Sequence, residues 1–194
     1  MASDSDYQRW AKGIRQRDEG AFHELFEASY KPLMRYARTF IHDFDAASDV
    51  LQDVYTYLWQ IRERVDEKKS LKALLYHITK NRCLNHLGVN RPGRLDDVIA
   101  SEIPRAEMEP DMFDDPEEQE LSLLITEWIE QLPQRRREAF ELSRFEGLDH
   151  NEIARVMDCS PRTVNNHIVQ ALEFLRSQLA LWKKNKKLRE GLTS

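Results

Sequence analysis

The sequence has few of the residues and runs that mark several large classes of protein. Among 194 residues there are only two cysteines, Cys83 and Cys159, too few for a disulfide framework, which indicates a reduced, cytoplasmic protein. The six glycines, seven prolines and scarce β-branched alternation favour helices throughout. No apolar run approaches the ~20 residues of a membrane-spanning helix, and the acidic, polar N-terminus is unlike a secretory signal.

Patterns typical of enzymes and metal proteins are also missing from the sequence. It contains no Ser, His and Asp in an order typical of a catalytic triad, and no glycine-rich loop that would bind phosphate. No residues have the spacing of metal ligands, and the six histidines are scattered along the chain. We therefore expect no enzymatic activity, no catalytic residue, no metal site and no cofactor.

Charge is abundant and unevenly distributed along the chain. The net charge is −5, but residues 94–120 alone carry two arginines against eleven acidic side chains, a net charge of −9. Residues 1–93 and 132–194 carry net charges of +2 and +4. The acidic stretch has three prolines and little apolar periodicity, which predicts a flexible linker, with a solvated loop of a single domain as the alternative.

Apolar spacing and capping residues predict an all-α fold of two small helical domains joined by this linker. The expected parts are a helical domain at 1–93, the linker at 94–120, a helix-turn-helix domain at 121–182 and a basic tail at 183–194. The first expected helix covers residues 7–17, a second is capped by Asp18, and a third follows Pro32. A fourth is capped by Asp45 and runs to Arg64, and a fifth is capped by Ser70 and ends at Leu87. Further helices are expected at residues 121–131, 133–145, 151–157 and 161–182.

The sharpest pattern lies in the segment LDHNEIARVMDCSPRTVNNHIVQALEFLR. Asp149 and Glu152 match a capping box before a short apolar helix. After a tight turn, Ser160 and Pro161 can begin a second helix, as N-cap and first helical residue. This arrangement is typical of a helix-turn-helix, and an ordinary helical hairpin with a solvated face is the alternative.

The second helix of this pattern has an apolar face at Val164, Ile168, Ala171 and Leu175 and a polar face opposite to it. Asn, Gln and Arg side chains can read base edges, and recognition helices present their N-terminal residues to the major groove. The residues expected to contact duplex DNA are Arg162, Thr163, Asn165, Asn166 and Gln170, with Arg144 and Arg155 from neighbouring helices as phosphate contacts.

The expected helix at 45–64 has an apolar stripe at Val50, Val54, Tyr57, Leu58 and Ile61. Its opposite face is unusual, because a tryptophan stands there among acidic and amide groups. Tryptophan is a common interface anchor, so one interpretation is a docking face for a partner with basic groups. The other is that the helix at 7–17, or another segment, covers the ring. The face consists of Asp49, Gln52, Asp53, Thr56, Trp59 and Gln60.

The expected helix at 71–87 loses its apolar stripe in its second half and becomes rich in basic, amide and aromatic groups. That combination suits single-stranded nucleic acid, and the polar turn at 66–70 could close over an extruded base. A plain helix leaving its domain is the alternative. The candidate contacts are Lys68, Lys69, Ser70, Tyr76, His77, Lys80, Asn81, Arg82 and Asn85.

Taken together, residues 21–178 resemble the extracytoplasmic-function (ECF, group 4) sigma factors of bacterial RNA polymerase. The resemblance is carried, in order, by ELFEASYKPLMRYARTFI, DAASDVLQDVYTYLWQIRERV, LKALLYHITKNRCLNHL, the acidic stretch and LPQRRREAFELSRFEGLDHNEIARVMDCSPRTVNNHIVQALEFLR. It implies transcription initiation at specific promoters, with core RNA polymerase and promoter DNA as partners.

The resemblance also assigns roles to the surfaces found above. The face with Trp59 is similar to the part that docks on the β′ clamp helices of the polymerase. The 68–70 turn and the helix after it resemble the part that captures and melts the −10 element, and the polar face of the 161–182 helix resembles the −35 reader. The helix at 133–145, with its arginine run at 135–137, resembles the part that packs near the β flap, and an anti-sigma factor is a further candidate partner.

Two other functions share features with this sequence. A response-regulator-type activator has a similar helix-turn-helix, but it would need an α/β phosphoacceptor domain where this chain is expected to be helical. A helical adaptor without a DNA role would leave the polar face of the 161–182 helix unexplained.

Overall fold

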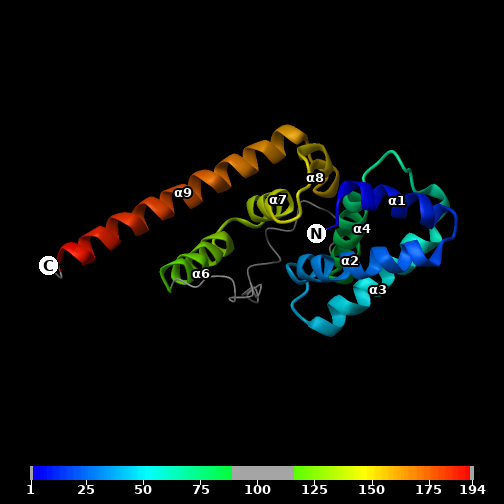
Figure 1. The fold of residues 1–194 in the computed structure, drawn as a ribbon, viewed down its shortest axis with the longest axis horizontal. Coiled ribbons are helices and arrows are strands. Elements are labelled where there is room, and N and C mark those ends of the chain that lie inside the picture. The colour runs from blue at the N-terminus through cyan, green and yellow to red at the C-terminus, as the bar shows by residue number, and fades with distance from the viewer. Residues whose placement is uncertain (1, 89–115, 193–194) are drawn as a thin grey trace. The chain divides into compact units, whose positions relative to one another are not determined.

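The structure is a computed structural model that describes residues 2–88 and 116–192. This part of the chain holds eight α-helices and one short 3₁₀ helix and no strand, so the all-α prediction is confirmed. The described residues form two compact units (Figure 1). One contains residues 2–88 and 151–158, which include most of α8 (His150–Val156), and the other contains residues 116–150 and 159–192. Residues 94–115 of the predicted linker lie outside the described residues. None of the described helices combines the length and apolar character that a bilayer crossing requires.

The first unit consists of α1 (Asp4–Arg15), α2 (Glu19–Arg38), α3 (Phe44–Gln60), the 3₁₀ helix η1 (Arg62–Arg64) and α4 (Leu71–His86). Side chains set where α2 and α4 begin. Asp18 accepts hydrogen bonds from the N–H groups of Gly20 and Ala21, and Ser70 accepts one from the N–H of Ala73 at 3.1 Å. These caps satisfy donors that lack a partner inside the helix, so both predicted caps are confirmed.

Helix α2 continues through Pro32, where the sequence predicts a break between two helices. Its buried residues Leu25, Ser29, Leu33 and Ala37 recur every four positions, so one unbroken stripe faces the core. A proline inside a helix costs about 3 kcal/mol, because a backbone hydrogen bond is lost. Breaking the helix would expose the stripe instead, and this burial explains why the predicted break is wrong.

Helix α3 is capped by Asp43, which accepts a hydrogen bond from the N–H of Ala46 at 2.8 Å, and not by the predicted Asp45. It ends at Gln60 and is followed by η1, earlier than the predicted end at Arg64. The predicted apolar stripe included Tyr57, which is 36% exposed. The buried face is instead made of Ala47, Val50, Leu51, Val54, Tyr55 and Leu58.

Helix α4 is central to the first unit, because it packs against α1, α2 and α3. Its Tyr76 ring meets the Tyr36 ring edge to face, with 5.0 Å between the centroids. Cys83 is fully buried, and burial raises the pKa of its thiol to about 12, so it remains protonated at neutral pH. A helix surrounded on three sides keeps few positions for contacts with a ligand.

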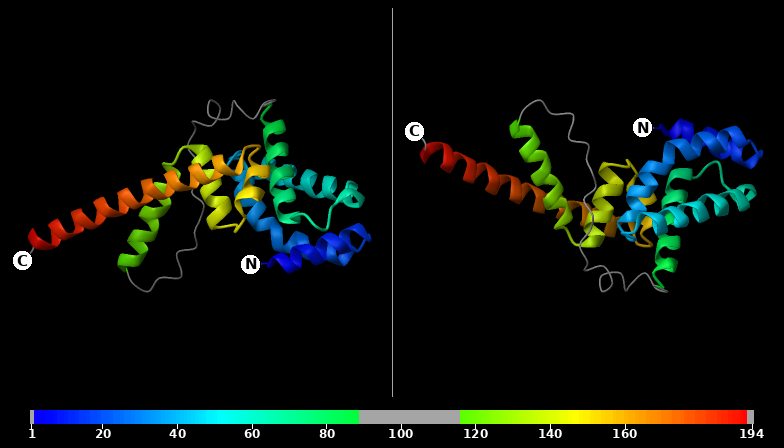
Figure 2. Two further views of the ribbon diagram at one scale, coloured as in Figure 1. Left: turned by 90° about the horizontal axis from the view of Figure 1, so that it is seen from above. Right: turned by 90° about the horizontal axis from the view of Figure 1, so that it is seen from below.

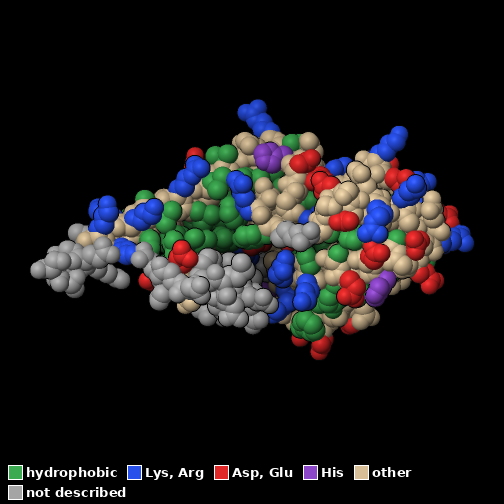
Figure 3. Space-filling view, in the orientation of Figure 1, with side chains coloured by type: hydrophobic (Ala, Val, Ile, Leu, Met, Phe, Trp, Pro, Cys, Tyr) green, Lys and Arg blue, Asp and Glu red, His purple; other side chains and the backbone are tan. Residues whose placement is uncertain are grey.

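The second unit is built from α6 (Pro116–Glu130), α7 (Gln134–Arg144) and α9 (Pro161–Leu192), around a core that includes Ile129, Phe140 and Ala171. Because α6 begins at Pro116, residues 116–120 of the predicted linker are helical. The predicted basic tail from residue 183 is also helical as far as residue 192, and Figure 2 shows this end of α9 extending beyond α6 and α7. Hydrophobic side chains gather over α6 and α9 in Figure 3.

Candidate nucleic-acid interface

The start of α9 is fixed by the residues that the sequence predicts. Ser160 accepts a hydrogen bond from the N–H of Thr163 at 3.1 Å, and Pro161 is the first helical residue. Proline suits this position because its missing N–H would have no partner there. The cap holds the first turn of α9, which carries the leading side chains of the predicted DNA-reading face.

The two faces of α9 divide as the sequence predicts. Val164, Ile168 and Ala171 are buried, with at most 5% exposure, whereas the opposite side chains reach solvent. Thr163 is half-buried beside the cap, and Val169 adds an exposed apolar group of the kind that contacts a thymine methyl. The predicted contacts that are exposed on this face are Arg162, Asn165, Asn166 and Gln170.

Two further arginines are exposed on the helices that precede α9 in the chain. Arg144 is the last residue of α7, and Arg155 lies in the last turn of the short helix α8 (His150–Val156). Gly147, between these helices, has φ of 67°, a conformation that glycine adopts without strain. Both side chains are exposed, as a phosphate contact would require, and that role stays a prediction.

The arginine run at 135–137 is largely covered in the structure. Arg137 is 4% exposed, and Arg135 and Arg136 are half-buried, because α7 packs against α9. Arg137 stabilises the charged form of Glu141, but burial dominates and raises the pKa of that carboxyl to about 7.

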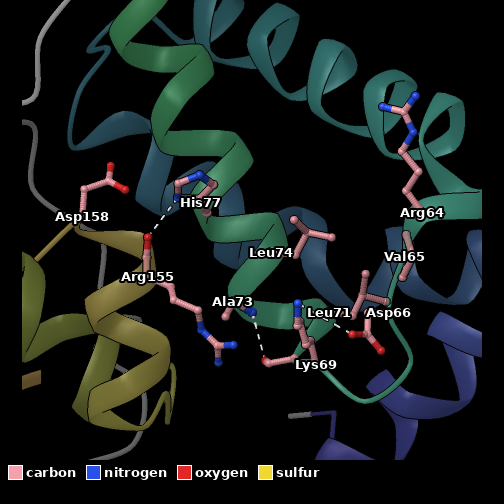
Figure 4. Close-up of a pocket in the computed structure, with 11 residues that line it drawn as sticks. Arg64, Val65, Asp66, Lys69, Leu71, Ala73, Leu74, His77, Arg155 and Asp158 are labelled. Atoms are coloured by element: carbon pink, nitrogen blue, oxygen red, sulfur yellow. Dashed lines mark hydrogen bonds and ion pairs between the residues drawn. The ribbon is translucent and has the colours of Figure 1, made fainter. Parts of the chain in front are cut away.

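In the first unit, the turn before α4 presents two lysines to solvent. Val65 anchors the turn in the core, and the Asp66 carboxylate accepts a hydrogen bond from the N–H of Lys68 at 3.0 Å. The same carboxylate pairs with Lys69 at 3.7 Å, and Ser70 then caps α4 (Figure 4). Lys68 and Lys69 are exposed, so their charges are available to a nucleic-acid backbone.

The structure divides the predicted contacts of α4 into accessible and buried residues. Asn85 is exposed, and Asn81 is half-buried, donating from Nδ2 to Nε2 of the half-buried His77 at 3.0 Å. The guanidinium of the half-buried Arg82 lies 4.9 Å from the centroid of the Tyr57 ring. The prediction fails for Tyr76 and Lys80, which are 2% and 5% exposed, because both point between the helices that surround α4.

The outward face of α3 is acidic and polar, as the sequence predicts. Counting 100° per residue from the centre of the buried face, Trp59 lies about 110° away, on the flank of the helix. Its five predicted companions are all exposed: Asp49, Gln52, Asp53, Thr56 and Gln60.

Trp59 itself is half-buried, so neither of the two interpretations from the sequence holds alone. The Phe22 ring of α2 meets it edge to face at 5.0 Å, and the Arg62 guanidinium lies 5.0 Å from its ring centroid. The covering segment is therefore α2 and not the helix at 7–17, and part of the ring remains accessible to a partner.

Sequence reasoning missed two arginines at the end of α1, Arg15 in its last turn and Arg17 just after it, which pair with residues of the turn before α4 and of η1. Arg15 pairs with Glu67 at 3.2 Å, and Arg17 pairs with Glu63 at 3.0 Å. Arg17 lowers the pKa of the Glu63 carboxyl through this hydrogen bond. No sequence signal could have found these pairs, because their members lie 52 and 46 residues apart.

Two family models match the chain, and together they cover the surfaces described above. The Sigma-70 region 2 model matches residues 25–91, which contain most of α2 and all of α3 and α4. The Sigma-70, region 4 model matches residues 122–175, which contain most of α6, then α7, α8 and the exposed polar face of α9.

Named relatives match over nearly the whole chain. The RNA polymerase sigma-H factor of Pseudomonas aeruginosa is 28% identical over 188 residues, covering 92% of this chain and 96% of that protein. The ECF RNA polymerase sigma factor RpoE of Cereibacter sphaeroides is 26% identical and covers 93% and 100%. The ECF RNA polymerase sigma-E factor of Haemophilus influenzae is 25% identical and covers 92% and 98%.

Solved structures share the fold. CnrH, in complex with the cytosolic domain of CnrY, superposes with a TM-score of 0.59 at 22% identity, covering 91% of this chain and 98% of CnrH. The sigma factor RpoE of Bartonella quintana, in complex with the anti-sigma factor NepR, gives 0.58 at 20% identity, covering 82% and 96%. With both regions matched in order and ECF relatives matched over most of its length, the chain belongs to the sigma-70 family, in its extracytoplasmic-function (ECF) group.

Proposed function

We propose that this chain is an alternative sigma factor that binds core RNA polymerase in the cytoplasm and directs it to specific promoters without catalysis of its own. One observation carries the proposal. The N-terminal half of α9 buries one face and exposes Arg162, Asn165, Asn166 and Gln170 on the other, inside the segment that matches Sigma-70, region 4. These side chains can hydrogen-bond to base edges in a major groove, so α9 is the proposed reader of the −35 element.

The −10 element is proposed to meet the first unit. Lys68 and Lys69 would contact phosphates, and the amides of Asn81 and Asn85 would contact an extruded base. Extruding a base costs a few kcal/mol of lost stacking, which these contacts have to offset. Each good side chain–base pair at the −35 element contributes about 1–3 kcal/mol.

Binding to core polymerase would make the modest −10 and −35 contacts sufficient for promoter recognition. The free chain carries a net charge of −5, so its own affinity for duplex DNA should be weak. Two small units fixed to one polymerase act at a high effective concentration once the first has bound. Specific initiation is therefore expected only from the complex with the polymerase.

Surfaces for protein partners are proposed on both units. The exposed acidic and amide face of α3, with the accessible part of Trp59, is the proposed contact with the β′ clamp helices. The second unit is the proposed contact with the β flap. An anti-sigma factor is proposed as a regulator, on the strength of the fold shared with an RpoE that binds the anti-sigma factor NepR.

Run-off transcription tests the proposal directly. Purified core polymerase with this chain should give specific transcripts from a promoter library, and core polymerase alone should not. Asn166→Ala should reduce discrimination at one −35 position by about 5- to 150-fold, which corresponds to about 1–3 kcal/mol. Ser177→Ala is the matched control, because it alters an exposed hydroxyl of α9 beyond the matched region. Absence of specific transcripts with the wild-type chain would refute the function, and an unaltered −35 preference in Asn166→Ala would refute that contact.

A further inference from the structure

We propose that the end of α1 positions the turn at 65–70 for capture of the −10 element, with Arg15 and Arg17 as positioning residues. This inference rests on the proposed function, because it concerns how the first unit selects DNA. Helix α1 lies outside the segment that matches Sigma-70 region 2, so the match assigns it no part in this step.

The two ion pairs bracket the start of the turn. Arg17 Nη2 lies 3.0 Å from Glu63 Oε1, in η1 just before the turn, and Arg15 Nη1 lies 3.2 Å from Glu67 Oε1, inside it. Glu67 is followed directly by Lys68, the first of the two exposed lysines. Movement of this part of the turn away from α1 therefore requires at least one of the pairs to break.

The backbone at Arg17 supports a specific use for its side chain. Arg17 has φ of 63°, in the left-handed region where a non-glycine residue is strained by about 1–2 kcal/mol. Two hydrogen bonds close the chain reversal between α1 and α2. The N–H of Arg17 donates to the carbonyl of Ile14, and the N–H of Asp18 donates to the carbonyl of Gly13, both at 3.0 Å. A glycine would relieve the strain but could not hold Glu63. An arginine in this conformation is the kind of outlier that points to a function.

The turn has its own internal contacts, so α1 has only to fix its position. Besides the contacts of the Asp66 carboxylate, the N–H of Lys69 donates to the Asp66 carbonyl at 3.0 Å. Val65 at one end is buried, and Ser70 at the other caps α4. A turn with a defined shape, held at one more point by α1, presents Lys68 and Lys69 in one place.

Both pairs are solvent-exposed, with side chains between 41% and 67% exposed, so they should contribute little to folding. Their loss should instead widen the range of positions that the turn adopts. The expected consequence is a two- to fivefold loss of discrimination at the −10 base nearest the turn, in line with about 0.4–1 kcal/mol for weak exposed pairs.

The experiment measures −10 base preference by run-off transcription, using core polymerase with the full-length chain on duplex DNA randomised across the −10 element. The test variant combines Arg15→Ala with Arg17→Ala. The matched control is Arg9→Ala, which breaks an equally exposed pair of α1, with Glu24 of α2 at 2.7 Å, that does not touch the turn. The −35 preference and the thermal unfolding of each variant are measured beside it.

The expected result is a flattened −10 preference in the test variant alone, with an unchanged −35 preference. Exchanging the charges of one pair, Arg15→Glu with Glu67→Arg, should restore discrimination relative to either single change. The inference is overturned if the test variant keeps the wild-type −10 preference, or if Arg9→Ala alters it equally. A wild-type chain that gives no specific transcripts overturns the proposed function itself, which is a different outcome.

Discussion

Gly13 of α1 lies directly against Ala21 of α2, and its replacement by alanine should destabilise the first unit. A Cβ at this position would stand 2.5 Å from the Cβ of Ala21, whereas ordinary contact begins near 3.4 Å. Neither methyl group has a torsion that could relieve the contact. The two helices would therefore have to separate by about 1 Å.

The magnitude follows from two opposing effects. Alanine in place of glycine inside a helix favours folding by about 1 kcal/mol. Forcing an extra carbon into a packed contact costs about 1–3 kcal/mol, and separation would also loosen the buried face of α1, including Trp10 and Ile14. We expect a net loss of about 1–2 kcal/mol in the free energy of unfolding.

Urea unfolding of the full chain, followed by tryptophan fluorescence and circular dichroism, measures this loss. Gly20→Ala is the matched control, because its Cβ would meet only the Oδ1 atom of Asp18 at 3.2 Å, and a carboxylate can move by the small distance required. That variant should be as stable as the wild type or slightly more stable. If Gly13→Ala were equally stable, the close crossing of α1 and α2 would be refuted.

Substitutions at two other residues test the second unit. Burial raises the pKa of Glu141 from 4.5 to about 7, so its contribution to stability is present below pH 4.5 and is lost as the pH rises through 7. Relative to the wild type, the free energy of unfolding of Glu141→Gln should therefore increase by about 1–3 kcal/mol between pH 4.5 and pH 8. Urea unfolding measures this difference, and a difference that does not change with pH would contradict the prediction. Ser160→Ala should lose about 1 kcal/mol by removing the N-cap of α9, whereas Ser160→Asp should retain it; equal loss in both would argue against the cap.

The features that the sequence predicts correctly depend on interactions between residues only a few positions apart in the chain. Asp18, Ser70 and Ser160 each accept a hydrogen bond from an N–H two or three residues later, so local spacing is sufficient to find them. The exposed face of α9 follows from periodicity alone, because the buried and polar positions alternate with the helical repeat.

The failed predictions depend on packing between segments far apart in the sequence. Pro32 breaks a helix in isolation, but the buried stripe from Leu25 to Ala37 holds α2 together. Tyr76 and Lys80 look like ligand contacts when α4 is considered with one apolar face, yet helices on three sides cover them. The cover of Trp59 by Phe22 has the same origin.

The same distinction explains how the first unit can combine stability with the proposed DNA-capture surface. Its core is provided by α4 and the helices around it, so the turn at 65–70 needs only Val65 and the Ser70 cap to be part of the fold. The two weak ion pairs of Arg15 and Arg17 can then fix the position of the turn with little effect on folding. Each contributes little to the free energy of unfolding compared with burial of the apolar core. Selectivity for the −10 element would thus be set by contacts whose loss leaves the fold intact. Measuring −10 discrimination and the free energy of unfolding in the same variants separates these two properties.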